Sequence, residues 1–444
     1  MSALARILAA KGEIVAGSDM ADTPTLAALR ELGIDARATS CGENLSQATK
    51  VVYSAAVDKE KDPEIATARR ARIPVLKRSQ MLGELMKSYG VKIAIAGTHG
   101  KTTTSAMIAR MLENAGKDPT ALIGGDVRAW GSNARLGKSD VFVAEACEAF
   151  ESFHDMHPSI SVVTNIEADH LDTYANLNKI IDAFRKFLAQ TSQTAVLCAD
   201  DPNCMRLVVG EIKSKVVTYG FSSSADICGI DMRVVEGPPP GSACTVLRRG
   251  KSLGEIALNV TGKHNVLNAL AAVAVGLETG LTFGEITAGL AAFQGTGRRF
   301  EKVGETTSGV LVIDDYAHHP TEIKATLSAA RAAYPNRRIV AVFQPHLPSR
   351  TRDFMDDFAQ AFADAHLVVL TDIYLARERP LKGVTGELLA QKVAQVREAD
   401  LVHFVENKDD LPDKLKGWAK PGDLVLTLGA GDIDKTGKQF LEMS

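Results

Sequence analysis

The residues best suited to carry chemistry lie in one glycine-rich segment, Gly97-Thr98-His99-Gly100-Lys101-Thr102-Thr103. This segment follows an apolar strand pattern at 91–96 and precedes a helical pattern at 104–114. Glycines let a backbone wrap phosphate groups, N–H groups at a helix start donate to them, and a lysine adds positive charge. A hydroxyl directly after the lysine can ligate Mg²⁺. The glycine spacing is shorter than in the usual Walker pattern, but the strand–loop–helix context predicts a nucleotide phosphate site rather than a chance turn.

Acidic side chains follow two further predicted strands. Glu145 comes directly after an apolar run at 141–144, and the segment 165–172, which contains His170, follows the run at 160–164. In an open α/β sheet, ligands collect at the carboxyl ends of the strands. Oxygen ligands with one imidazole suit Mg²⁺ or Mn²⁺. Either cluster alone would more often be a solvated loop, but together with the glycine-rich segment they predict a metal–nucleotide site.

The elements that must position these residues follow an α/β pattern. Apolar β-branched runs alternate with Ala- and Leu-rich helical patterns, which is typical of parallel α/β domains. The chain has 444 residues, more than one hydrophobic core usually supports. We expect three domains, at residues 1–89, 90–297 and 298–444. The first begins with a helix at about 3–10, where a doubly wound domain would begin with a strand and a Gly-rich turn.

Each expected domain has its own predicted strands. The first has strands at about 13–16, 50–53 and 74–76, and the third has strands at 310–314, 338–343, 367–371 and 423–428. The second has strands at 91–96, 141–144, 160–164 and 195–198, extra β-structure within 216–260, and a helix at 265–278.

Composition excludes several classes of protein. The formal net charge of -3 gives no general attraction to nucleic acid. The six cysteines include no CxxC pair, so neither a zinc ligand set nor a small disulfide framework is expected. We find no signal peptide and no apolar run of about 18 residues, so we expect no membrane insertion. These observations predict a cytoplasmic protein with free thiols.

Seven motifs together resemble those of the Mur ligases, over nearly the whole chain. They are GTHGKTTT (97–104), TNIEADHLDTY (164–174), GKHNVLNALAA (262–272), GRRFE (297–301), DDYAHHPTEI (314–323), FQPH (343–346) and GAGDI (429–433). The resemblance implies a Rossmann-like UDP-binding domain, a central P-loop ATPase domain and a C-terminal Rossmann-like domain. It implies that ATP with Mg²⁺ (or Mn²⁺) activates the carboxylate of UDP-N-acetylmuramate as an acyl phosphate, which L-alanine then attacks. A monomer or homodimer is expected.

The resemblance also implies site residues. Four are expected to act in catalysis, namely Lys101, His318, His346 and Arg350. The set expected to bind ATP is Gly97, Thr98, His99, Gly100, Lys101, Thr102, Thr103, His264, Asn265, Asn268, Arg299 and Asp315. The implied metal ligands are Thr102, Glu145 and His170, and the implied substrate contacts are Ser18, Asp19, Ser54, Ala55 and Tyr316.

The sequence departs from the family pattern at three places. Met1 aligns with the end of the family's first Gly-rich loop, so we expect the first domain to lack its first strand and that loop. The segment 147–151 is less acidic than usual, and Leu347-Pro348 stand where the family has Arg-Tyr. Three alternatives stay open: a ligase that recycles a murein tripeptide onto UDP-muramate, a folylpolyglutamate-type ligase, and an inactive nucleotide-binding homologue.

Overall fold

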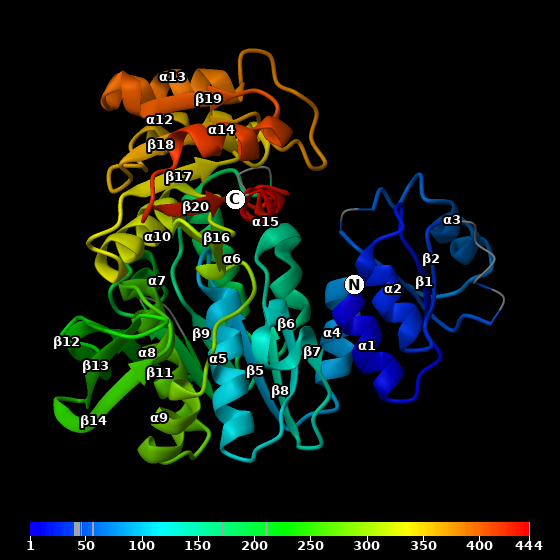
Figure 1. The fold of residues 1–444 in the computed structure, drawn as a ribbon. Helices are drawn as coiled ribbons and strands as arrows, with labels where there is room; N and C mark the ends of the chain where they lie inside the picture. The colour runs from blue at the N-terminus through cyan, green and yellow to red at the C-terminus, as the bar shows by residue number, and fades with distance from the viewer. Residues whose placement is uncertain (40–44, 46, 56, 170–172, 209–211, 444) are drawn as a thin grey trace. The chain divides into compact units, whose positions relative to one another are not determined.

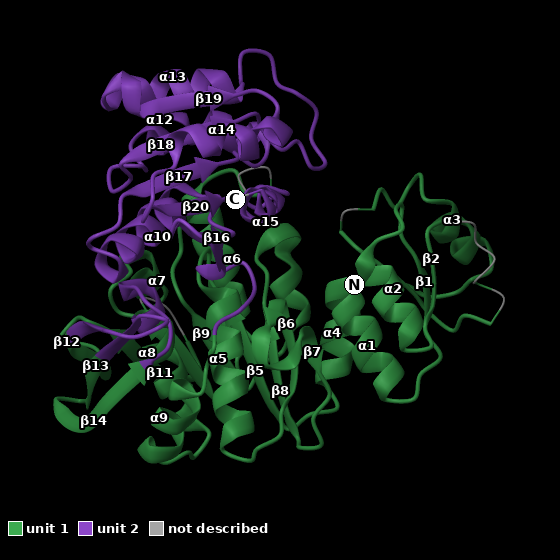
Figure 2. Ribbon diagram, viewed as in Figure 1, with its two compact units in different colours: residues 1–231, 244–257, 267–294 green, residues 232–243, 258–266, 295–444 purple. Residues whose placement is uncertain are grey.

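The computed structural model describes residues 1–39, 45, 47–55, 57–169, 173–208 and 212–443. The chain divides into two compact units, which Figure 2 colours green and purple. The first unit comprises residues 1–231, 244–257 and 267–294, and the second comprises residues 232–243, 258–266 and 295–444. The order of the elements can be followed by colour in Figure 1. Among the described residues, no helix is both long and apolar enough to cross a membrane.

The helices are α1 (Ser2–Ala10), α2 (Pro24–Glu31), α3 (Pro63–Arg70), α4 (Arg78–Met86), α5 (Lys101–Asn114), α6 (Leu177–Ala189), α7 (Pro202–Val208), α8 (Lys263–Glu278), α9 (Phe283–Ala291), α10 (Pro320–Ala333), α11 (Pro348–Asp353), α12 (Met355–Ala359), α13 (Gly386–Val396), α14 (Leu411–Trp418) and α15 (Asp434–Glu442). The strands are β1 (Ala16–Ser18), β2 (Asp35–Arg37), β3 (Val51–Tyr53), β4 (Val75–Lys77), β5 (Val91–Ala96), β6 (Thr120–Val127), β7 (Ser132–Arg135), β8 (Val141–Glu145), β9 (Ile160–Val163), β10 (Thr194–Cys198), β11 (Lys215–Gly220), β12 (Ile227–Val235), β13 (Gly241–Arg248), β14 (Lys251–Leu258), β15 (Glu301–Glu305), β16 (Leu311–Asp315), β17 (Ile339–Phe343), β18 (Leu367–Thr371), β19 (Val402–Val405) and β20 (Leu424–Leu428).

The first ninety residues hold two short parallel strand pairs, β1–β2 and β3–β4. Within the described residues, no strand joins one pair to the other. The strand expected at 13–16 is wrong, because pairing with β2 begins only at Ala16. After α1 the amide of Glu13 still donates to the carbonyl of Leu8, and Ile14 is 98% exposed, so this stretch is a connection rather than a strand.

The central sheet has ten strands in the order β14-β13-β12-β11-β10-β9-β5-β8-β6-β7. Strands β6, β8, β5, β9, β10 and β11 pair in parallel, and β7 is antiparallel to β6. Helix α5 packs against β5, β6, β8 and α9. Gly289 permits the close approach of α9, since a Cβ there would lie 2.6 Å from the Cα of Met111. The extra β-structure expected within 216–260 is confirmed as β11–β14.

The second unit contains a six-stranded sheet in the order β15-β16-β20-β17-β18-β19. All neighbours are parallel except β15, which runs antiparallel to β16. Alternate residues face opposite sides: Leu311 and Ile313 join a core with α10, α12 and α13, while Val312 joins a core with α14 and α15. Because both faces are covered, the strands are continuous apolar runs, as the sequence predicts for a parallel sheet.

Candidate active site

The loop between β5 and α5 has the backbone conformation that a phosphate site requires. Gly97 has φ +131°, and Gly100, the N-cap of α5, has φ +82°. A Cβ on Gly100 would lie 2.6 Å from Asn268 Oδ1, and a Cβ on Gly97 would collide with the hydroxyl of Thr164. Only glycine fits both positions without strain. The loop leads directly into the first turn of α5, where unsatisfied N–H groups favour an anion.

A second loop, after β9, holds the glycine-rich loop in place. The amide of His99 donates to Asn165 Oδ1 (2.8 Å), and Asn165 Nδ2 donates to the carbonyl of His99 (3.0 Å). The amide of Thr98 donates to the carbonyl of Asn165 (3.0 Å), and Thr98 Oγ1 accepts from the amide of Glu167 (2.9 Å). The Thr98 side chain therefore supports the loop, and Asn165 is a positioning residue that the sequence analysis did not single out.

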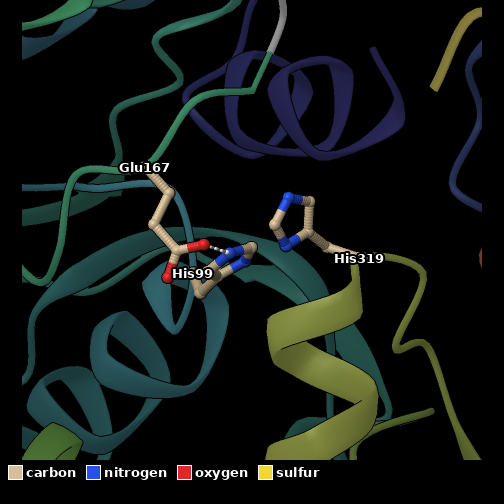
Figure 3. Close-up of side chains that lie close together, drawn as sticks. All are labelled: His99, Glu167 and His319. Atoms are coloured by element: carbon tan, nitrogen blue, oxygen red, sulfur yellow. Dashed lines mark ion pairs between the residues drawn. The ribbon is translucent and has the colours of Figure 1, made fainter. Parts of the chain in front are cut away.

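The side chains of His99 and Glu167 also form an ion pair, with Nε2 and Oε2 3.6 Å apart (Figure 3). His99 is 14% exposed and Glu167 is 32% exposed at their side chains. The third side chain drawn in Figure 3, His319, belongs to the second unit, where it caps the start of α10. The hydrogen bonds of Asn165 and Thr98, together with the pairing of His99 with Glu167, fix the 164–167 loop against the glycine-rich loop.

Lys101 is held by three oxygens. Its Nζ donates to the carbonyl of Gly97, to the carbonyl of Thr98 (3.0 Å) and to Glu148 Oε1 (3.0 Å). The side chains of Lys101 and Glu148 are 13% and 4% exposed. Burial alone would lower the pKa of Lys101, but the negative charge of Glu148, with Glu145 nearby, raises it well above its usual value. Lys101 is therefore charged, and Glu148 is its carboxylate partner.

Thr102 and Glu145 lie together, as expected for a shared metal. Thr102 Oγ1 donates to Glu145 Oε2 (2.9 Å), and the amide of Gly124 donates to the same oxygen (2.8 Å). A hydroxyl and a carboxylate are oxygen donors of the kind Mg²⁺ prefers, so these two residues fit the ion. The third expected ligand, His170, lies outside the described residues.

The start of α8 carries the three residues expected near adenine. Asn268 is 6% exposed and lies beside Gly100. Asn265 Nδ2 donates to the carbonyl of Thr261 (2.7 Å), which secures the beginning of the helix. His264 has its pKa lowered to about 4 by burial and by the charge of Arg299, so its imidazole is neutral at neutral pH.

The four substrate contacts expected near the N-terminus occur on two different strand pairs. Ser18 ends β1, and its hydroxyl donates to Glu64 Oε2 (2.8 Å). The amide of Asp19 donates to the carbonyl of Arg37 (3.0 Å). Ser54 and Ala55 directly follow β3. These residues lie at the carboxyl ends of parallel strands, but the hydroxyl of Ser18 is already engaged by Glu64.

In the second unit, the structure brings together Tyr316, His318, His346 and Arg350. The ring centroids of Tyr316 and His318 are 5.3 Å apart, and those of His318 and His346 are 5.7 Å apart. Arg350 Nη1 lies 3.4 Å from His346 Nδ1, and Arg350 is 7% exposed. Burial lowers the pKa of His318 to about 3, against the opposing effect of Glu322. A neutral imidazole beside a buried guanidinium suits a site that binds a carboxylate through the guanidinium and offers an uncharged hydrogen-bonding ring beside it.

The His318 tautomer follows from its contacts. Nδ1 lies 2.9 Å from the carbonyl oxygen of Tyr316 and 3.3 Å from Glu322 Oε2, both of which only accept. Nδ1 therefore carries the proton, and Nε2 has the lone pair.

Asp315, at the end of β16, is buried, and both of its carboxylate oxygens accept hydrogen bonds from backbone amides. Its carboxylate accepts from the amides of Phe300 (2.8 Å) and Ala317 (2.8 Å). Burial raises its pKa to about 6, partly offset by Arg299. The guanidinium carbon of Arg299 lies 5.1 Å from the ring centroid of Tyr316. Asp315 and Arg299 are thus close to Tyr316 within one unit.

Arg298, which the sequence analysis did not select, fixes the loop after β20. Its Nε donates to Asp314 Oδ2 (3.0 Å), and its two terminal nitrogens donate to the carbonyls of Gly431 (2.8 Å) and Gly429 (2.8 Å). Asp314 also accepts from Thr427 Oγ1 (2.6 Å). Arg298 thereby links the segment before β15 to the GAGDI motif.

Three family profiles match the chain. "Mur ligase family, catalytic domain" matches residues 1–90, "Mur ligase middle domain" matches 95–276, and "Mur ligase, glutamate ligase domain" matches 298–431. A UDP-N-acetylmuramate–L-alanine ligase of Salinibacter ruber is 46% identical over 446 residues, which cover 100% of this chain and 92% of that protein. The chain belongs to the Mur ligase family. The relative of the same name from Trichlorobacter lovleyi is 45% identical and covers 100% of this Mur ligase and 96% of the relative.

Solved structures agree with this assignment. The UDP-N-acetylmuramate–alanine ligase of Thermotoga maritima superposes with a TM-score of 0.84 at 30% identity, covering 100% of this Mur ligase and 96% of that chain. A murein peptide ligase of Psychrobacter arcticus superposes with a TM-score of 0.71 at 25% identity, with the same coverage. The α/β Mur ligase architecture expected from the sequence is confirmed.

Four residues of this Mur ligase that contact or support expected site residues were missed by the sequence analysis: Asn165, Glu148, Arg298 and Tyr374, whose ring stacks on His346. Two of them had a signal. Asn165 lies inside the TNIEADHLDTY motif, and Glu148 follows Glu145 within the acidic segment after β8. Arg298 stands beside Arg299 in GRRFE, and both guanidinium carbons lie 5.1 Å from the ring centroid of Tyr316. The sequence does not reveal that Arg298 is the one that donates to the carbonyls of Gly429 and Gly431.

Proposed function

We propose that this chain is an ATP-dependent ligase that joins L-alanine to UDP-N-acetylmuramate in peptidoglycan precursor synthesis. The observation that carries the proposal is the 46% identity, over the whole chain, to a relative of that name. The two side-chain clusters support it, because one suits a nucleotide and the other suits an amino acid. The boundaries at 89 and 297 are part of the proposal.

In the first step, an oxygen of the muramate carboxylate attacks the γ-phosphorus of ATP. A carboxylate–phosphorus bond forms, the bond from phosphorus to the β–γ bridging oxygen breaks, and ADP leaves. Lys101 would exchange its contact with Glu148 for the β- and γ-phosphates, while N–H groups of the 97–103 loop would hold the phosphate oxygens. Thr98, His99 and Thr103 belong to that cradle.

Thr102 and Glu145 would hold Mg²⁺, and His170 is proposed as a further ligand. The ion would supply charge neutralisation where carboxylate and triphosphate, both negative, must meet. Asn268, with His264 and Asn265, is proposed to bind adenine, and Arg299 and Asp315 the ribose or phosphates. Ser18, Asp19, Ser54 and Ala55 are proposed to contact the UDP-sugar.

In the second step, the amine of L-alanine attacks the acyl phosphate carbon, and phosphate leaves through a tetrahedral intermediate. Arg350 and His346 would bind the amino acid's carboxylate, and Tyr316 would line the site. His318 is neutral at pH 7, because its pKa is lowered to about 3 by burial. Its Nε2 lone pair would accept a hydrogen bond from the amine and orient it, while the leaving phosphate, a stronger base than an imidazole of this pKa, would take the proton that the amine loses.

A cytoplasmic location and a monomeric or homodimeric state complete the proposal. The described cysteines Cys147, Cys198, Cys204, Cys228 and Cys244 are free, which suits a reducing compartment.

The test is phosphate release from ATP and Mg²⁺ with UDP-N-acetylmuramate, with L-alanine, glycine, L-serine and murein tripeptide supplied separately. Release that requires both the UDP-sugar and L-alanine would support the proposal. Release only with the tripeptide would assign the recycling reaction instead, and no release with any acceptor would contradict a ligase role for this chain.

A further inference from the structure

The row of rings in the second unit continues past the residues expected from the sequence. Tyr374, in the segment after β18, stacks on His346 with ring centroids 5.8 Å apart and planes 13° apart. His346 in turn contacts His318 and Arg350. Tyr374 is 38% exposed, so its ring forms the outer end of the row. No residue of this segment belongs to the motifs that carry the family resemblance.

The backbone of Tyr374 also fastens the turn that bears His346. The amide of Tyr374 donates to the carbonyl of Pro345 (2.8 Å), and the amide of Leu347 donates to the carbonyl of Tyr374 (3.0 Å). Leu347 has φ +69°, a region that L-residues rarely adopt, so these bonds hold a strained turn. They involve only main-chain atoms and survive a change of the Tyr374 side chain.

The loop after β20 also packs against the Tyr374 ring, at Gly431. A Cβ on Gly431 would lie 2.7 Å from Tyr374 Cγ, so only glycine leaves room for the ring at its present place. Gly431 is fixed by Arg298, whose Nη1 donates to its carbonyl (2.8 Å). The Tyr374 ring is therefore packed against both a candidate substrate-binding histidine and an immobilised glycine.

The hydrogen-bonding pattern of His346 follows from its contacts with Arg350 and Tyr374. A guanidinium only donates hydrogen bonds, so the contact from Arg350 makes His346 Nδ1 the acceptor and places the proton on Nε2. An Nε2–H beside a buried arginine is a donor pair that matches a carboxylate. Because the ring of Tyr374 lies nearly parallel to the imidazole, it restricts rotation of the imidazole and so sets where Nε2–H points.

We propose that Tyr374 is a positioning residue that holds His346 to receive the carboxylate of the incoming amino acid. The inference rests on the proposed function and deepens it for the amino-acid site. Aromatic stacking stabilises a side chain enough to alter binding about three- to tenfold when it is lost. A ring without the hydroxyl should act as well as tyrosine, because no contact of the phenol is required.

Steady-state phosphate release would be measured for Tyr374→Leu, Tyr374→Phe and Gly431→Ala, with Leu375→Ala as the matched control at an exposed neighbour. Tyr374→Leu and Gly431→Ala should raise the KM for L-alanine about three- to tenfold and leave the KM for ATP within twofold. Tyr374→Phe and Leu375→Ala should resemble the wild type. A wild-type KM for L-alanine in Tyr374→Leu, or an equal rise in the KM for ATP, would overturn the assignment.

A second readout does not depend on turnover. With ¹⁵N-labelled histidine, NMR should show His346 as the Nε2–H tautomer in the wild type and in Tyr374→Phe, and as a mixture of tautomers in Tyr374→Leu. If the wild type releases no phosphate but the tautomer still responds in this way, the proposed function fails and the positioning role stands. An unchanged His346 spectrum in Tyr374→Leu would refute the positioning role whatever the activity.

Discussion

Replacing Glu148 by glutamine tests how much the negative charge of Glu148 contributes to holding Lys101. Glutamine keeps the shape of the side chain and an oxygen able to accept from Lys101 Nζ, but it removes the negative charge. Under the proposed function, the 3.0 Å ion pair with Glu148 competes with ATP, because the same ammonium group would contact the phosphates. The variant should therefore be less stable without nucleotide and should bind nucleotide more tightly.

The magnitude follows from the burial of the pair. Removing one partner of a buried ion pair costs about 3–5 kcal/mol. Lys101 keeps two carbonyl acceptors and gains the amide oxygen, so we expect a smaller loss of unfolding free energy, about 2 kcal/mol. In a chain of 444 residues that lowers the melting temperature by roughly 2 °C. Because this free energy no longer has to be overcome when ATP binds, the Kd for ATP should fall by up to about 30-fold.

The assay is calorimetric titration with a non-hydrolysable ATP analogue and Mg²⁺, together with thermal unfolding with and without the analogue. Glu151→Gln, the same change at an exposed neighbour, is the control and should alter neither quantity. The reasoning is refuted if Glu148→Gln leaves the melting temperature unchanged or weakens nucleotide binding. The second result would mean that the carboxylate acts on the bound nucleotide rather than in place of it.

Four further changes test individual assignments. Lys101→Ala should abolish ATP turnover, and normal phosphate release would overturn the phosphate-loop assignment. Gly100→Ala should weaken nucleotide binding about tenfold or more, because φ +82° costs an L-residue about 1–2 kcal/mol and the new Cβ displaces Asn268; equal titration curves would contradict this. Arg350→Ala should raise the KM for L-alanine about 30-fold or more with little change for ATP, since a buried charge contact is lost; an unchanged amino-acid dependence would remove Arg350 from the site. His318 has a folded pKa of about 3, below its unfolded value, so the stability it contributes is lost as pH falls from about 6.5 towards 3. In urea unfolding, the free energy of unfolding of His318→Gln should therefore fall by about 2 kcal/mol less than that of the wild type between pH 7 and 5, and an equal fall in both proteins would contradict this.

The sequence predicts best the parts of the structure whose signal is local. The run at 91–96 is a strand at those residues, and the helix expected at 104–114 ends as predicted but begins three residues earlier, at Lys101. Apolar runs without alternation predict buried parallel strands, and β16 is buried along its whole length. Where the local signal is weak, as at Glu13–Ala16, the outcome depends on which backbone meets β2, and hydropathy alone does not reveal this.

The candidate site shows the same division. Lys101 and Thr102 are recognised by their spacing, because phosphate binding uses consecutive residues. Their partners come from far along the chain, since Glu148 reaches Lys101 across 47 positions and Asn165 reaches His99 across 66. Tyr374 follows a strand with no motif of its own and contacts His346 only because β17 and β18 are neighbours. Such contacts are set by strand order, which periodicity does not encode.

The place of β20 between β16 and β17 has a consequence for synthesis of the protein. During translation, β16 and β17 emerge well before β20, so the centre of their sheet stays incomplete while the residues up to Leu424 are added. At about 5–20 residues per second, that interval lasts roughly 5 to 20 seconds. Throughout it, apolar strands that are fully buried in the finished unit have an open edge, a state that other nascent chains can join. The second unit is therefore more open to strand-to-strand association at this stage of biosynthesis than after folding.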